Sequence, residues 1–146
     1  MAQSLLLQGY WAGQLLPQAT IGAAAAGVLS TPVTGLLGMQ VVTAQFVFLY
    51  GADGTSVKAY LQTSFDNGTT WVDVACFAVT TTAATRHFSV RSAIAVAANY
   101  TPTDATLTDN TIKDGLLGDR LRVKYTSVGT YSGATSLAVH AVVKGA

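Results

Sequence analysis

The chain has 146 residues, of which 50% are hydrophobic and only 10% are charged, and its formal net charge is +1. A chain of this length can bury the core of a single domain, and we expect one domain over residues 1–146. Typical soluble domains carry about 25% charged residues, so we expect neighbouring molecules to cover part of this surface. The near-neutral balance also excludes the basic patch that direct nucleic-acid binding requires.

The cysteine content and the N-terminus predict a soluble protein made in the cytoplasm. Cys76 is the only cysteine, so no disulfide can form within the chain, which fits a reducing compartment. The first eight residues lack the basic start and the apolar core of a signal peptide. No apolar run reaches the length of about 20 residues that spans a membrane, and we expect no membrane partner.

The N-terminal third predicts extended structure. Residues 1–18 are largely apolar, and both an early strand and an extended arm fit them. Residues 20–30 contain four consecutive alanines between glycines, which favours a strand or a tightly packed segment. Residues 40–50 combine valines and aromatic residues almost without polar ones, which predicts a strand buried on both faces.

A β-hairpin is the clearest local prediction. Apolar and polar residues alternate over residues 56–65, as in a half-exposed strand. Asn67 and Gly68 then predict a type I′ turn, because both central positions of that turn need positive φ. Residues 70–80 form the return strand, in which we expect Trp71 to share the core-facing side with Ala75 and Phe77.

The rest of the chain predicts three more strands and one long loop. Strands are expected over residues 84–92, 119–127 and 135–144, and the loop over residues 99–118, with one turn of helix at 111–117. About eight closely spaced strands without a long helical period indicate an all-β fold. We predict an antiparallel β-sandwich that resembles a jelly roll.

No set of residues predicts catalysis. Ser89, His87 and Asp73 could supply the types of a catalytic triad, but residues spaced along one strand do not orient one another. His140 is isolated in a strand, where a packing or surface role is common. We therefore expect no enzyme activity and no cofactor.

Metal binding and sugar binding are each weighed against a structural reading. Four aspartates recur every fifth residue in the long loop, at positions 104, 109, 114 and 119, and such carboxylates can bind calcium. The order of a calcium-binding loop is absent, and turn chemistry explains them better, so we predict no metal. Trp71 could stack on a sugar, but a core position is favoured, and Cys76 is expected to be a small buried hydrophobe.

Two segments carry a resemblance to a known group of proteins. They are AYLQTSFDNGTTWVDVACF at 59–77 and DGLLGDRLRVKY at 114–125, followed by GTY at 129–131. Together they resemble small virion structural proteins of tailed bacteriophages, over about the last two thirds of the chain. The resemblance implies a minor capsid or head decoration protein located in the virion. It implies no catalytic or binding residues.

A decoration protein of this kind would bind and stabilise the capsid lattice. Its expected partners are further copies of itself, as a homotrimer or another symmetric oligomer, and the major capsid protein. An N-terminal arm too short to build its own core would contact a neighbour, and we assign this role to Leu5, Leu6, Leu7, Tyr10 and Trp11.

Two alternatives remain open. A tail, baseplate or head-to-tail connector protein would share the composition and the fold. A carbohydrate-binding module on the virion would need Tyr60, Trp71 or Tyr131 exposed together.

Overall fold

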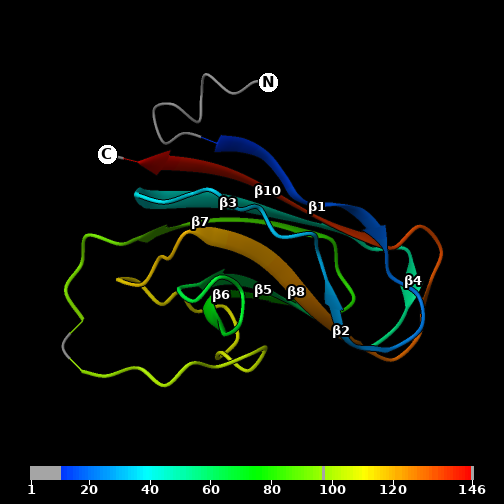
Figure 1. Ribbon diagram of the computed structural model, residues 1–146. Helices are drawn as coiled ribbons and strands as arrows, with labels where there is room; N and C mark the ends of the chain where they lie inside the picture. The colour runs from blue at the N-terminus through cyan, green and yellow to red at the C-terminus, as the bar shows by residue number, and fades with distance from the viewer. Residues whose placement is uncertain (1–10, 97, 146) are drawn as a thin grey trace.

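The computed structural model describes residues 11–96 and 98–145, which form two stacked antiparallel sheets (Figure 1). The first, which we name the open sheet, has the order β1 (Trp11–Thr20), β10 (Ser136–Gly145), β3 (Met39–Leu49), β7 (Ala84–Arg91). The second, the covered sheet, has the order β2 (Ala25–Leu29), β8 (Arg120–Val128), β5 (Ser56–Ser64), β6 (Trp71–Val79). A small ribbon joins β4 (Ala52–Asp53) to β9 (Tyr131–Ser132).

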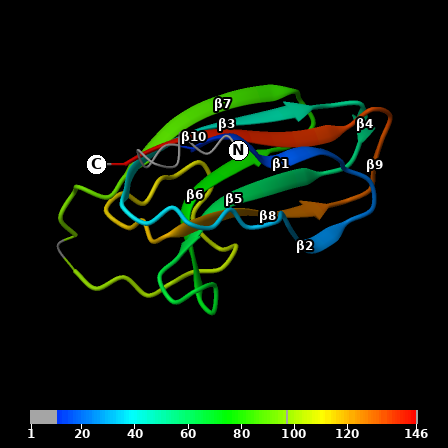
Figure 2. The same cartoon turned by 45° about the horizontal axis from the view of Figure 1, so that its top comes forward.

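The strand order is that of a jelly roll. The first main strand, β1, pairs with the last, β10, and β8 lies between β2 and β5, so segments far apart in the chain become neighbours (Figure 2). Eight long strands in two four-stranded sheets define this architecture. The predicted all-β antiparallel sandwich is confirmed, and no helix among the described residues is long and apolar enough to span a membrane.

The core lies between the inner faces of the two sheets. Leu137 and Val139 of β10 and Leu121 and Val123 of β8 are fully buried, as their alternation with polar residues predicts. Phe46 packs among them from β3 and contacts Phe77 of the covered sheet, with 5.2 Å between ring centroids.

The predicted burial of two strands is wrong in opposite directions. β3 is buried on one face only, and its other face leaves Thr43 exposed. β5 is buried on both faces, with Gln62 0% exposed on the side that alternation assigned to solvent. β5 is buried on both faces because residues 98–119, which we name the covering loop, lie along the outer side of the covered sheet (Figure 1). No described segment covers the outer side of the open sheet in this way, so β3 is buried on one face only.

The hairpin turn has the predicted geometry. Asn67 and Gly68 have φ angles of 58° and 85°, and the Thr69 amide donates to the Asp66 carbonyl at 3.3 Å. Two positive φ angles define a type I′ turn, which confirms this prediction. The return strand then departs from plain alternation, because a β-bulge shifts the register between Leu61 and Gln62 of β5.

The bulge corrects the predicted position of Trp71. Asp73 pairs with Gln62 and Ala75 with Leu61, so the residue between them is extra, and the strand changes faces there. Trp71 is buried, but it stacks on Arg122 of β8 instead of joining Ala75 and Phe77 in the core.

One further prediction needs correction, and two are confirmed. Of the two alternatives for residues 1–18, the early strand holds for residues 11–18, which belong to β1, where Trp11 lies opposite Val143 and packs half-buried against the core; residues 1–10 lie outside the described part. Residues 111–117 form no helical turn, because Ile112 bridges to Ala75. Cys76 is a buried free cysteine, as expected.

Candidate assembly surface

The covering loop is fixed to the covered sheet by backbone hydrogen bonds to β6 and by one buried carboxylate. Asp73 is 0% exposed and accepts five hydrogen bonds, from atoms in five residues. The donors are Gln62 Nε2 at 2.8 Å, Thr103 Oγ1 at 2.9 Å, and the backbone amides of Ala105, Thr106 and Leu107 at 3.0, 3.0 and 3.2 Å. Four of the five donors belong to the loop and the fifth to β5, so this carboxylate holds structure and is not free for chemistry.

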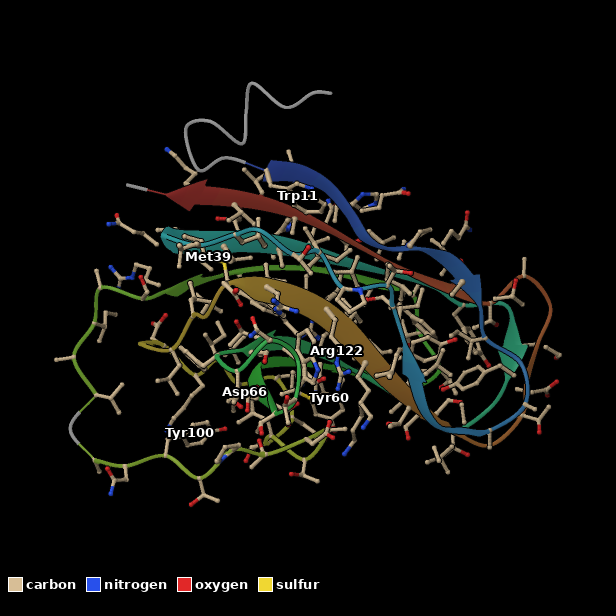
Figure 3. The ribbon with its side chains drawn as sticks, viewed as in Figure 1. Trp11, Met39, Tyr60, Asp66, Tyr100 and Arg122 are labelled. Atoms are coloured by element: carbon tan, nitrogen blue, oxygen red, sulfur yellow. The ribbon has the colours of Figure 1, made fainter. Side chains whose placement is uncertain are left out.

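Gln62 extends this network to the cations of β8. Its amide donates to Asp104 at 2.7 Å, and its carbonyl oxygen accepts from Arg122 Nε at 2.7 Å. The Arg122 guanidinium lies 4.2 Å from the Trp71 ring centroid, and Lys124 Nζ lies 3.0 Å from Asp104. Figure 3 shows Arg122 and Tyr60 near each other on the loop side of the covered sheet, away from Trp11 on the open sheet.

The surroundings of this network shift the pKa values of two side chains, Asp104 and Tyr60. Burial acts to raise the pKa of Asp104, but the hydrogen bonds from Gln62 and Lys124 and the nearby positive charges outweigh it and lower this pKa. Burial raises the pKa of the Tyr60 phenol well above its ordinary value, and negative charge at Cys76 and Asp73 adds to the effect. No buried side-chain nitrogen or oxygen in the described ranges lacks a partner, so the covered sheet offers no unsatisfied polar site.

The outer face of the open sheet, in contrast, has no covering segment among the described residues. One row of paired residues crosses all four strands: Gln14, His140, Gln45 and His87. Gln45 Nε2 lies 3.0 Å from His87 Nε2. The rows beside it carry small or uncharged side chains such as Thr43, and a shallow hollow of about 390 Å³ lies along the face.

Charge is divided unequally between the two sides of the molecule. The four strands of the open sheet carry three cations, Arg86, Arg91 and Lys144, and no aspartate. The rest of the chain carries the other five cations and all seven aspartates. The net charge of +1 therefore divides into +3 for the open sheet and −2 for the remainder. Arg86 pairs with the core residue Phe46 and lies over the Phe77 ring, so Arg91 and Lys144 are the cations on the outer side, which favours contact between the open face and a neutral or acidic surface.

The loop aspartates do not converge on a common point. Asp104 pairs with Lys124, and Asp109 pairs with Lys58 at 2.8 Å. Asp114 accepts from the backbone amide of Arg91, and Asp119 lies 3.1 Å from Arg120 Nε. Each carboxylate has a separate partner, and the described residues contain no group of three or more potential ligands placed to share an ion.

The other candidate residues are also dispersed. Asp73 is buried in the covered sheet, whereas His87 and Ser89 are exposed on β7 of the open sheet, so the structure does not assemble them. Tyr60, Trp71 and Tyr131 are 3%, 9% and 3% exposed, so they form no aromatic platform for a sugar. Leu5, Leu6, Leu7 and Tyr10 lie outside the described residues, and Trp11 is the one predicted contact residue that the structure places.

The sequence analysis missed both the buried network and the open face. A signal for the first was present, because Gln62 and Asp73 are polar residues in otherwise apolar strand surroundings. A signal for the second was the absence of aspartate from the four open-sheet strands. Comparisons with protein-family models, with curated proteins and with solved structures found no match to this chain.

Proposed function

We propose that this chain is a structural protein of a bacteriophage particle, a minor capsid or decoration protein that binds the capsid lattice as a symmetric oligomer. The observation that carries the proposal is the contrast between the two sheets. One outer face is closed by the chain's own loop and a complete hydrogen-bond network, whereas the other is uncovered among the described residues and free of acidic side chains. A face of this kind suits a protein–protein contact.

Three further observations support the proposal. Jelly rolls are a frequent architecture of viral capsid proteins, although the fold alone assigns no function. The charged fraction of 10% is low for a protein that has to remain dispersed by itself. The segments that resemble phage virion proteins form the hairpin, the bulged strand and the start of β8, which together hold the covering loop in place.

A pair of valine substitutions tests the proposed contact face. Val142 is 50% exposed in the middle of the open face, and Val128 is 57% exposed at the end of β8 in the covered sheet. Val142→Asp places an unpaired charge in the contact, whereas Val128→Asp adds the same charge elsewhere and serves as the matched control. Thermal melting should show that both variants remain folded, because neither side chain is buried.

The readout is co-sedimentation of the purified chain with particles of the phage that encodes it. The wild type and Val128→Asp should sediment with particles, and Val142→Asp should remain in the supernatant. Equal binding by all three proteins would reject the open face as the contact. Binding to isolated tails in place of heads would reassign the chain to the tail, baseplate or connector.

A further inference from the structure

Three of the four strands at the sheet edges are closed to pairing with a further strand. The covering loop occupies the edge of β6, where the Cys76 amide donates to the Thr111 carbonyl at 3.0 Å. The Lys113 amide donates to the Val74 carbonyl of the same strand at 2.8 Å. β1 contains Pro17 and two register shifts, and β2 has only five residues and one register shift. Proline, bulges and short strands are features by which proteins block the edges of sheets.

The edge of β7 is the exception. This strand lies at the outer edge of the open sheet, contains no proline and pairs with β3 in unbroken register (Figure 2). Just beyond it, the Ser92 amide donates to the Gln40 carbonyl at 2.8 Å, which fixes the alternation of backbone directions along β7. Thr85, His87 and Ser89 therefore direct their backbone N–H and C=O groups away from β3. No other described residue forms a hydrogen bond with these groups.

The covering loop marks where this free edge stops. The next residue that faces outward is Arg91, whose carbonyl accepts from the Gly115 amide at 2.7 Å. The Arg91 amide donates to Asp114 Oδ1 at 2.8 Å, so both of its backbone groups are occupied. At the other end, β7 begins at Ala84. The free edge therefore covers residues 85–89, with His87 at its centre, and its three outward-facing residues are exposed.

A free edge of this kind is complementary to a second copy of itself. When two β7 strands pair antiparallel with His87 opposite His87, Thr85 lies opposite Ser89 on both sides, and each pair exchanges two backbone hydrogen bonds. A shift of the register in one direction would place Arg86 directly opposite the other copy's Arg86, and like charges in that position are destabilising. A shift in the other direction would need the backbone groups of Arg91, which the covering loop already occupies. One register therefore fits the free edge.

This pairing also extends the proposed contact face. Directly opposite side chains of an antiparallel pair lie on the same side of the sheet, so the two-fold axis between the copies is perpendicular to the sheet. The open faces of both copies then point in the same direction, and the four strands of each open sheet join into one continuous sheet. A strand from a different protein could bond to the same edge, but it would not double the contact face. A second copy is therefore the occupant that fits the proposed function.

We propose that two copies of this chain join through their β7 edges, with His87 at the two-fold axis. This inference rests on the proposed function, because it specifies how copies of the oligomer are joined. On the inner side of the new strand pair, Arg86 of each copy lies opposite Phe88 of the other, which keeps the two guanidinium groups apart. The interface is the same patch on both copies, as a two-fold axis requires.

Mild oxidation of introduced cysteines in the full-length chain tests the pairing and its register. Opposite Cα atoms of a hydrogen-bonded antiparallel pair lie about 5.5 Å apart, which a disulfide can span, so His87→Cys should cross-link to itself. The matched control is Thr85→Cys on the same exposed edge, because its own mate lies four residues along the strand, about 14 Å away. Cys76 is buried and stays in place, so the unmodified chain is the blank. We expect about tenfold or more covalent dimer from His87→Cys than from Thr85→Cys.

Two further measurements complete the test. A mixture of Thr85→Cys with Ser89→Cys should cross-link as readily as His87→Cys, because these positions lie opposite each other in the proposed register. Sedimentation of the unmodified chain should show dimers at high concentration. Monomers alone, or equal cross-linking of His87→Cys and Thr85→Cys, would overturn the proposal. Particles are not involved, so a dimeric chain that fails to bind particles ends the virion role alone, whereas a monomer that binds them ends this inference alone.

Discussion

Replacing Asp73 with alanine should release the covering loop and cost a large part of the protein's stability. Asp73→Ala removes the acceptor of five hydrogen bonds, three of which come from the consecutive loop amides of Ala105, Thr106 and Leu107. Each hydrogen bond to a charged group contributes about 1.5–3 kcal/mol, but water can solvate the loop amides once the loop is free. We therefore expect a loss of about 3–5 kcal/mol, as for breaking a buried ionic network.

Urea unfolding and amide hydrogen exchange measure the two consequences of this substitution. The free energy of unfolding should fall by that amount, and the amides of residues 105–107 should lose their protection. Asp109→Ala is the control in the same loop, since its pair with Lys58 is half-exposed and should contribute at most about 1 kcal/mol. A loss below about 1 kcal/mol for Asp73→Ala, with unchanged exchange, would refute the anchoring role of this carboxylate.

Three further substitutions test the loop contact, the hairpin and the pH dependence. A Cβ on residue 118 would lie 1.8 Å from the Ser64 carbonyl oxygen, so Gly118→Ala should lower the free energy of unfolding by about 3 kcal/mol, seen as a lower urea midpoint. Gly22→Ala, with open space around residue 22, should leave the midpoint unchanged. Gly68→Ala should cost about 1–2 kcal/mol because the residue has a φ of 85°, and a neutral result would contradict the type I′ turn. The folded state lowers the pKa of Asp104, so its contribution is fully present above the unfolded pKa of about 4 and is lost as the pH falls below that value through the lower folded pKa. Asp104→Asn should therefore flatten the acid limb of the stability curve, and an unchanged acid limb would argue against that coupling.

The strands could be predicted from the sequence because their signals are local. Alternation along residues 119–127 and 135–144 identifies β8 and β10, and Asn67-Gly68 identifies the turn before β6. Each of these signals depends on neighbours within a few residues. The number of strands and the lack of a long helical period then indicate an antiparallel sandwich, whereas the jelly-roll order depends on pairings between strands far apart in the chain.

Burial by distant segments could not be predicted in the same way. Gln62 alternates with apolar residues and looks exposed, but residues 98–119 return to cover it. The bulge opposite Leu61 reverses the faces of β6, and nothing in the spacing of Trp71 and Asp73 reveals it. The open face was also missed, because which sheet a loop covers depends on the chain's path across the sandwich.

Electron microscopy of the phage particles that we propose contain this chain tests the central claim most directly. The account predicts density for the eight-stranded sandwich at repeated positions on the capsid lattice, with β1, β10, β3 and β7 facing the neighbouring protein. Particles with no density for this chain, together with a purified protein that stays monomeric at high concentration, would contradict the account.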